Sequence, residues 1–250
     1  MKKSLLIAIT AIAFCLPAVS QQESGRKWEY RMFAGHNAGG SMPLPLPAEI
    51  RKIRYWSPEP FTGSLAFHVT RFISPKWGVT SGLAIDVKGM KTEADVKYMN
   101  TSLVVGEGDH QGVFQGMFTG RNKLRIRNGY LVLPLLGTYA PSRVWRFHAG
   151  GYVAFLQDAR FEGNASDGYI RQGGPAGDRI NIEESTFDFS DNVRKTDAGV
   201  MALADWFFTK KLAVTGQLSW GLVSLFPGDF NGIPYKMYNI YLMGGIAYRL

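Results

Sequence analysis

The chain ends with the stretch YNIYLMGGIAYRL, which runs from Tyr238 to Leu250. Apart from Gly244, every second side chain in this stretch is bulky and apolar or aromatic, and the side chains between them form a mixed, partly polar set. The two sets are Tyr238, Ile240, Leu242, Ile246, Tyr248 and Leu250, and Asn239, Tyr241, Met243, Gly245, Ala247 and Arg249. A period of two is that of a β-strand, because successive side chains of a strand point to opposite faces. The stretch therefore predicts a long strand with one oily face.

The same alternation recurs along most of the chain. In WGVTSGLAIDVKG, residues 77–89, the bulky apolar residues share one face, and small and charged residues, including Asp86 and Lys88, share the other. The strands are about 10 residues or longer, which suits a tilted membrane strand better than the roughly 5–6 of a globular sheet. Eight such segments lie near residues 27–37, 62–73, 77–90, 126–140, 144–158, 196–209, 212–225 and 237–250. They predict an all-β fold, an eight-stranded antiparallel up-and-down transmembrane β-barrel with a polar interior.

The connections between the predicted strands alternate in length. Short turns fall at 74–76, at 141–143 and around Lys210, and long polar segments fall at 38–60, 90–125, 160–195 and 226–236. In outer-membrane barrels the short turns face the periplasm and the long loops face outward. Within 90–125 a weak alternation persists, which indicates strands that extend above the membrane. Aromatic residues cluster beside the short turns and predict a girdle there; they are Trp28, Tyr30, Phe72, Trp77, Tyr139, Trp145, Trp206, Phe208 and Tyr248.

The first 20 residues predict a cleaved secretory signal. Lys2 and Lys3 precede an apolar core, and Ala18-Val19-Ser20 forms a small-x-small cleavage site. The expected organisation is a signal peptide over 1–20 and one outer-membrane β-barrel domain over 21–250, located in the outer membrane of a Gram-negative cell. Cys15 is the single cysteine, so the mature chain must be held by a large core or a closed sheet instead of disulfides. The alternative is a lipoprotein acylated at Cys15, where the large Phe14 disfavours processing.

The excess of basic residues limits the kinds of partner that the chain is expected to bind. The formal net charge is +8, which suits either contact with anionic lipopolysaccharide or a merely soluble basic surface. An exported protein rarely meets nucleic acid, so no nucleic-acid partner is expected. The predicted partners are outer-membrane lipid and lipopolysaccharide, the barrel-assembly machinery during biogenesis, and an extracellular protein or glycan ligand.

Two stretches carry a family resemblance. YLVLPLLGTYAP, Tyr130 to Pro141, places a proline in mid-strand between aliphatic residues and a tyrosine before the turn, and GGIAYRL, Gly244 to Leu250, closes the chain. They resemble the fourth and closing strands of the PorT-like outer-membrane β-barrel proteins of Bacteroidota, and the whole pattern resembles small barrels of the OmpA/OmpX kind. Leu250 departs from the terminal aromatic usual in that family. The resemblance implies a porin-like family with mostly unassigned functions; one branch is tied to type IX secretion, and this chain is not assigned to it.

The predicted interior of the barrel carries many charges. An eight-stranded barrel is just filled by its own side chains, so inward charges must pair. The predicted interior polar network is Glu29, Arg31, His68, Asp86, Lys88, Arg146, His148, Asp205 and Arg249. We expect a salt-bridged plug, and the alternative is a narrow ion- or proton-conducting path along the same residues. A lipid-modifying enzyme that uses His68 or His148 is disfavoured because no serine stands in a nucleophile context. No catalytic residue, cofactor or metal site is predicted.

The long loops are the predicted functional surface. Loop 38–60 joins a proline-rich run to a basic and aromatic stretch, Arg51, Lys52, Arg54, Tyr55 and Trp56. This stretch suits lipopolysaccharide phosphates or a partner protein, and the alternative is a stiff cap over the barrel mouth. The sequence therefore predicts a non-enzymatic outer-membrane protein with a structural or surface-binding role.

Overall fold

The computed structural model describes residues 27–105, 112–172, 174 and 176–250. The signal peptide expected at residues 1–20 lies outside this part of the chain. Within it, ten β-strands join one antiparallel sheet. They are β1 (Trp28–Pro43), β2 (Ile50–Pro58), β3 (Gly63–Phe72), β4 (Trp77–Val105), β5 (Gly112–Tyr139), β6 (Trp145–Arg171), β7 (Arg179–Asp188), β8 (Thr196–Phe207), β9 (Leu212–Gly221) and β10 (Met237–Arg249), with the 3-10 turn η2 at Ser190–Asn192. The described residues include no helix long and apolar enough to cross a membrane.

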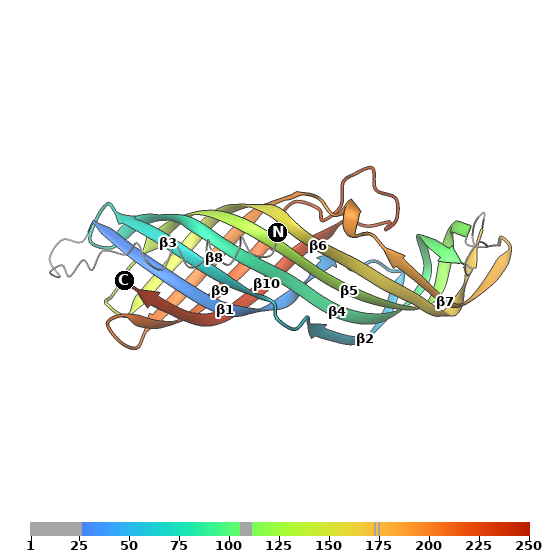
Figure 1. The fold of residues 1–250 in the computed structure, drawn as a ribbon, viewed down its shortest axis with the longest axis horizontal. Coiled ribbons are helices and arrows are strands. Elements are labelled where there is room, and N and C mark those ends of the chain that lie inside the picture. Colours follow the sequence, from blue (N-terminus) through green and yellow to red (C-terminus); the bar gives the residue numbers. More distant parts are fainter. Residues whose placement is uncertain (1–26, 106–111, 173, 175) are drawn as a thin grey trace, which may run out of the picture.

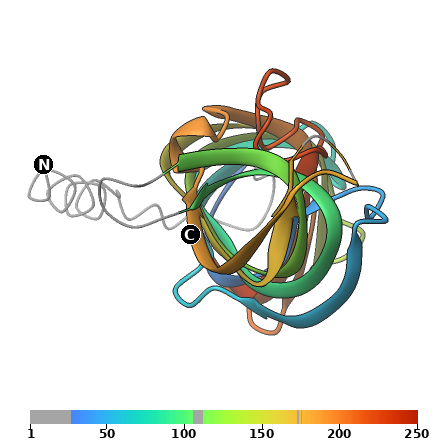
Figure 2. The same cartoon turned by 90° about the vertical axis from the view of Figure 1, so that its right-hand side faces the viewer.

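Eight of these strands close into a ring. Hydrogen-bonded neighbours follow the order β3–β1–β10–β9–β8–β6–β5, and β4 pairs with both β5 and β3 to complete the circle. Figure 2 looks along the barrel and shows the wall closing on itself. The predicted fold class is thereby confirmed. The two further strands, β2 and β7, pair with the outer parts of β4 and β6 and stand outside the ring.

Three segments expected to be long loops are largely strand. β2 lies within 38–60, the β4–β5 hairpin fills most of 90–125, and β7 and the end of β6 lie within 160–195. The expectation of loops at 38–60 and 160–195 is wrong for these parts, because β2 pairs with β4 and β7 pairs with β6, and one small apolar cluster joins β7 to the outer parts of β4, β5 and β6. That cluster consists of Val96, Met99, Phe118, Ala165, Ile170 and Ile182, all buried.

Side-chain burial on the barrel strands follows the predicted alternation. On β10, Tyr241, Met243 and Ala247 are buried, whereas Leu242 and Ile246 are 60% and 50% exposed. Leaving such a side chain in water instead of burying it forgoes about 1.5–3 kcal/mol. The outward apolar residues encircle the barrel, so this surface is suited to lipid.

Aromatic side chains mark the end that carries the short turns. Trp77 lies opposite Tyr139 across β4 and β5, and their ring centroids are 4.5 Å apart. Trp145 lies opposite Trp206 across β6 and β8, and Trp28 is exposed on β1. These rings face outward beside the short turns, as the sequence predicts.

The barrel wall divides at the opposite end. β2 and β3 follow one another along the same edge of β4, separated by a kink at residues 59–62 in which Phe61 has a φ of 60°. β1 instead stays paired with β10 up to Pro43. The strands beyond the division project far past the barrel mouth (Figure 1). We call this part the projecting sheet; it comprises β2, β7 and residues 89–105, 112–127 and 158–171 of β4, β5 and β6.

Candidate functional site

The interior of the barrel is filled by alternating polar and apolar layers. In the layer nearest the short turns, Glu29 Oε2 lies 3.6 Å from Arg146 Nη2 and 3.4 Å from Arg249 Nη1. The Arg249 guanidinium also lies over the Phe207 ring, 4.8 Å from its centroid. The three charged residues come from β1, β6 and β10, so one carboxylate joins strands that are distant in sequence. Two cations around one buried carboxylate satisfy the requirement for pairing.

The second polar layer centres on Asp205. Arg31 forms an ion pair with the Asp205 carboxylate, and His148 Nε2 lies 3.3 Å from Asp205 Oδ2. His68 Nδ1 lies 3.4 Å from Arg31 Nη2. None of these four residues is more than 3% exposed. Removing either member of the ion pair would leave an uncompensated buried charge, which is strongly destabilising.

A hydroxyl, an imidazole and a carboxylate stand in line within this layer. The Thr138 hydroxyl lies 2.8 Å from His148 Nδ1, and the other ring nitrogen faces Asp205. This is the order of a nucleophile, a base and an orienting group. Thr138 is fully buried, however, and its hydroxyl also contacts Thr80 Oγ1 at 2.5 Å. A substrate could not reach this hydroxyl without opening the barrel, so the arrangement acts as internal packing.

An apolar layer separates the Asp205 cluster from the next charges. It contains the buried side chains Phe33, Val132, Leu136, Met201, Leu203 and Met243. They come from four strands, β1, β5, β8 and β10. An ion that crossed the barrel would have to pass between these side chains, where the buried Gln217, in register with Leu203 and Met243, offers a neutral amide and no charge; such a passage is costly.

The third polar layer encloses Lys88. Its Nζ lies 3.8 Å from Asp86 Oδ2 and 3.8 Å from Asp197 Oδ2. Asn37 donates to Asp86 at 2.6 Å, and Asn239 donates to Asp197 at 3.0 Å. Three phenol rings complete the enclosure, those of Tyr130, Tyr152 and Tyr241, with centroids 5.5, 5.1 and 5.9 Å from Nζ. The ammonium is therefore held by both ion pairs and cation–π contacts.

A second apolar layer fills the mouth of the barrel. Phe161 and Phe226 meet edge to face with ring centroids 4.9 Å apart, and Met90, Ile126 and Met237 belong to the same cluster. Phe226 belongs to the β9–β10 connection, so this connection covers the mouth. The bore is consequently blocked at two apolar levels.

All nine side chains of the predicted interior network are buried or half-buried, but they form three separate clusters. The prediction omitted Asp197, Asn239 and Tyr241, and the signal for them was present. Asp197 shares the parity of Asp205 on β8, and Asn239 and Tyr241 share that of Arg249 on β10. Within the described residues, no group of three or more His, Cys, Asp or Glu side chains is arranged to hold a metal.

The basic and aromatic stretch of the sequence forms the edge strand β2. Arg51, Lys52, Arg54, Tyr55 and Trp56 are all exposed, Tyr55 by 53% and Trp56 by 46%. Arg54 Nε donates to Asp95 Oδ1 at 2.7 Å, and this hydrogen bond lowers the pKa of the Asp95 carboxyl. No described carboxylate forms an ion pair with Arg51 or Lys52. Arg51, Lys52 and two aromatic rings are thus exposed at this edge without a direct ion pair, although Lys52 stands opposite Asp95 and its charge acts on that carboxylate.

The pairing of β2 with β4 is irregular. The register shifts between Ile50 and Lys52 and again between Ile53 and Tyr55, so Arg51 and Arg54 are the extra residues. Bulges and charged side chains on an edge strand hinder the addition of another strand. β2 therefore offers its side chains to a partner more readily than its backbone.

Glu59 follows the end of β2 and anchors it to β4 and β5. It accepts from Arg125 Nε at 2.8 Å, and its other oxygen lies 3.1 Å from Lys91 Nζ. Burial opposes ionisation of Glu59, but the hydrogen bonds from Arg125 and Lys91 outweigh it and lower the pKa of this carboxyl. Lys91 and Arg125 lie directly opposite each other on β4 and β5, where like charges repel. The carboxylate between them removes that repulsion.

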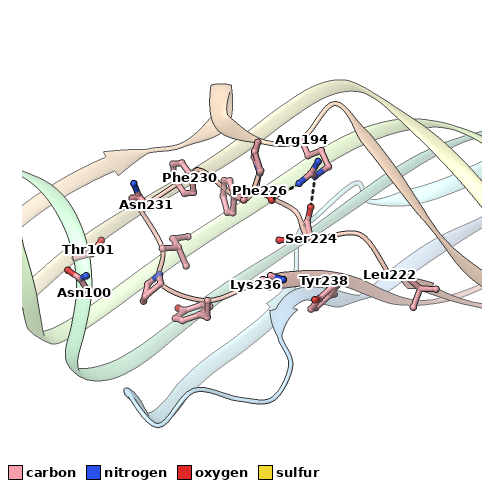
Figure 3. A pocket seen from close by; sticks show the side chains of 15 residues that line it. Asn100, Thr101, Arg194, Leu222, Ser224, Phe226, Phe230, Asn231, Lys236 and Tyr238 are labelled. Carbon is pink, nitrogen blue, oxygen red and sulfur yellow. Dashed lines mark hydrogen bonds between the residues drawn. The ribbon is translucent and has the colours of Figure 1, made fainter.

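A cleft of about 720 Å³ lies beside the β9–β10 connection (Figure 3). Arg194 lies at its edge and donates to the carbonyl oxygens of Ser224 at 3.1 Å and Phe226 at 3.3 Å. On the facing β4, Thr101 donates to Gly232 O at 3.1 Å. The cleft could not be predicted from the sequence, because its walls combine residues 100–101 of β4 with Arg194 and residues 222–238, which are far apart along the chain.

Known outer-membrane proteins are similar to this chain in sequence pattern or in fold. The family model described as outer membrane protein beta-barrel domain matches residues 19–227. Among solved structures, the chain is similar to Ail, the attachment invasion locus protein of Yersinia pestis, crystallised with the heparin analogue sucrose octasulfate; the TM-score is 0.33 and the identity 9%, over 89% of this chain and 97% of that one. It is also similar to the outer membrane protease OmpT of Escherichia coli, with a TM-score of 0.30 and 13% identity over 94% of this chain and 100% of that one. Both likenesses are too distant to indicate a function. The search of curated proteins gives no match.

Proposed function

The chain belongs to the family of outer membrane protein beta-barrel domains, and we propose that it is a closed barrel which binds an acidic extracellular glycan through strand β2. In barrels of this family's kind the short turns face the periplasm, so the projecting sheet lies on the cell surface. Export by a signal peptide over 1–20 is part of the proposal. So is a closer kinship with the PorT-like barrels of Bacteroidota, which the stretches Tyr130 to Pro141 and Gly244 to Leu250 support.

The observation that carries the proposal is the exposure of β2. Arg51 and Lys52 have no ion-pair partner among the described residues, and Tyr55 and Trp56 expose about half of their surface. Guanidinium and ammonium groups bind the sulfate, phosphate or carboxylate groups of acidic sugars. Tyrosine and tryptophan supply large, rigid contact area with a polar edge. The bulges at Arg51 and Arg54 favour such side-chain recognition over pairing with a strand of a partner protein.

The interior supports a non-conducting and non-enzymatic barrel. Two apolar layers cross the bore between and beyond the ionic clusters, which argues against the alternative of a narrow channel. The hydroxyl of Thr138 beside His148 is fully buried, which argues against the alternative of a lipid-modifying enzyme. The barrel then serves as a rigid support for the projecting sheet.

The proposal is tested by binding of the purified, detergent-solubilised barrel to dextran sulfate and to uncharged dextran. We expect binding to dextran sulfate alone, weakened at least tenfold in the variant Arg51→Gln, Lys52→Gln, Trp56→Ala. Salt should weaken it further, because surface charges are screened.

A matched control removes two charges elsewhere on the projecting sheet and one aromatic ring from the kink at residues 59–62. In this control, Lys123→Gln, Arg160→Gln and Phe61→Ala replace exposed side chains. It should bind dextran sulfate as the wild type does. Equal loss in both variants, or binding to neither polymer by the wild type, would contradict a glycan site on β2.

A further inference from the structure

Exposed basic side chains gather at the short-turn end of the barrel. They are Lys27, Arg71, Lys76, Arg143, Lys210 and Lys211, which we call the basic rim. Among the described residues, the side-chain carboxylates at this end are Glu29 and Asp205, and both are buried. Each is already neutralised by internal arginines. The rim therefore presents positive charge that no described side-chain carboxylate at this end balances.

The cations of the rim lie beside the outward aromatic rings. The Arg71 guanidinium lies over the Trp28 ring, 5.5 Å from its centroid. Lys211 Nζ lies 5.5 Å from the Tyr248 ring centroid and 3.3 Å from its hydroxyl. Aromatic girdles sit at the level of lipid head groups. These two cations consequently stand where the phosphates of a membrane leaflet lie.

A groove on the outer wall leads away from Arg71. It has a volume of about 380 Å³ and is lined by Trp28, Val69, Arg71, Val79, Ser81 and Gly82. Trp28, Arg71 and Val79 form one row across β1, β3 and β4. In the next row toward the middle of the barrel, Ser81 stands opposite Val69, and its small side chain leaves the hollow. A cation therefore stands at the end of an apolar groove that opens to the bilayer.

We infer that the basic rim binds anionic phospholipids of the periplasmic leaflet, and that the groove beside Arg71 is one defined lipid site. The lipid phosphate pairs with the Arg71 guanidinium, and an acyl chain lies in the groove along Val69, Val79 and Ser81. A soluble acidic partner fits less well. Arg71 and Lys211 stand on the outer wall beside the girdle, on opposite sides of β1 and β10, and do not converge on the bore. The inference does not depend on the glycan site proposed for β2.

The test places the purified barrel in nanodiscs of phosphatidylcholine with increasing fractions of phosphatidylglycerol. The readout is the temperature at which the folded, faster-migrating form on a gel is lost. Ligands that bind only the folded state raise this temperature, so we expect it to rise with phosphatidylglycerol. The variant Arg71→Gln, Lys76→Gln, Lys211→Gln should lose most of the rise.

A control variant removes three exposed charges from the projecting sheet, through Lys97→Gln, Lys123→Gln and Arg160→Gln. It should keep the full rise. Native mass spectrometry of the barrel released from mixed nanodiscs gives a second readout. There Arg71→Gln alone should reduce retained phosphatidylglycerol several-fold and leave retained phosphatidylcholine unchanged.

Two results would overturn the inference. One is an equal rise in the rim variant and in the wild type, which would mean that the rim does not bind the lipid. The other concerns nanodiscs of phosphatidylcholine alone, to which soluble polyglutamate is added. If the temperature at which the folded form is lost then rises as much as it does with phosphatidylglycerol, the rim would be assigned to an acidic soluble partner.

Discussion

Charged side chains are buried and paired in the barrel interior, whereas those on strand β2 of the projecting sheet are exposed. Inside, Asp205 is fully buried and is paired with Arg31, and Lys88 is 1% exposed between two carboxylates. On β2, Arg51 and Lys52 are exposed and form no ion pair with a described carboxylate. A buried charge must be paired because desolvation is costly, whereas an exposed charge costs little. Burial therefore decides the role of a charge: a buried charged side chain must be paired for stability, whereas an exposed one, such as Arg51 or Lys52, stays available to a ligand.

The largest expected effect comes from breaking the buried ion pair. Asp205→Ala leaves Arg31 unpaired among buried residues and should lower the free energy of unfolding by about 3–5 kcal/mol. The measurement is the urea midpoint at which the heat-modifiable form disappears in detergent micelles. The double variant Arg31→Met, Asp205→Leu should recover most of the loss, because no charge is then left alone. A similar loss in the single and double variants would contradict this account of the layer.

Two substitutions at neighbouring positions of β5 test which face of the strand points into the barrel, and we expect a smaller loss of stability from them. Leu136→Ala removes a side chain that is 1% exposed in the inner apolar layer and should cost roughly 2–5 kcal/mol. Leu135→Ala, its neighbour on the outward face, removes a side chain that is 66% exposed. Leu135→Ala should therefore lower the free energy of unfolding much less in the same urea titration. If Leu135→Ala cost as much as Leu136→Ala, the assignment of inner and outer faces would be wrong.

Removing the Glu59 anchor of β2 should have a still smaller effect on stability, and this effect should depend on pH. Glu59→Gln removes the carboxylate between Lys91 and Arg125 and should weaken this attachment by about 1–3 kcal/mol at neutral pH. The pKa of Glu59 is lowered in the folded state, so its stabilisation is present above the unfolded pKa and disappears as the pH falls through the folded pKa. Hydrogen exchange of residues 50–58 is the measurement.

For this anchor the wild type and the variant should differ at neutral pH and converge in strong acid. Asp158→Asn serves as the control, since Asp158 is 74% exposed on its side chain and lies 4.0 Å from Arg127. If hydrogen exchange of residues 50–58 still differed between the wild type and Glu59→Gln in strong acid, the charge of the Glu59 carboxylate would not be what attaches β2.

The smallest effect belongs to the exposed cations. Arg51→Gln with Lys52→Gln should change the free energy of unfolding by less than about 0.5 kcal/mol, because surface substitutions away from buried contacts are nearly neutral. The urea midpoint measured for the Asp205 variants is the readout. A change as large as that of Glu59→Gln would mean that β2 is held by these side chains and is not free to bind.

The ring of strands could be predicted from the sequence because a period of two is a local signal. In Tyr238 to Leu250 the alternation alone separates Leu242 and Ile246 on the outside from Met243 and Ala247 on the inside. The same parity placed Arg31 and Asp205 inward, and it would have found Asp197 if applied to every strand.

The projecting sheet could not be predicted in the same way. β2 exposes nearly all of its side chains, so it has no apolar face to recognise. Its position follows from pairing with β4 and from the contact of Glu59 with Lys91 and Arg125, which lie far away in sequence. The division of the interior charges into three layers likewise depends on which strands meet across the bore.

The most direct test of the closed bore is conductance in planar lipid bilayers, measured in concentrated potassium chloride with the purified barrel and with its Asp86→Asn and Arg146→Gln variants. We expect no conductance steps above the bare bilayer for any of the three proteins, because the apolar layers around Leu136 and Phe161 block the path. Reproducible unit steps in the wild type that change size in either variant would show that ions pass along the interior charges, and the barrel would then be a channel.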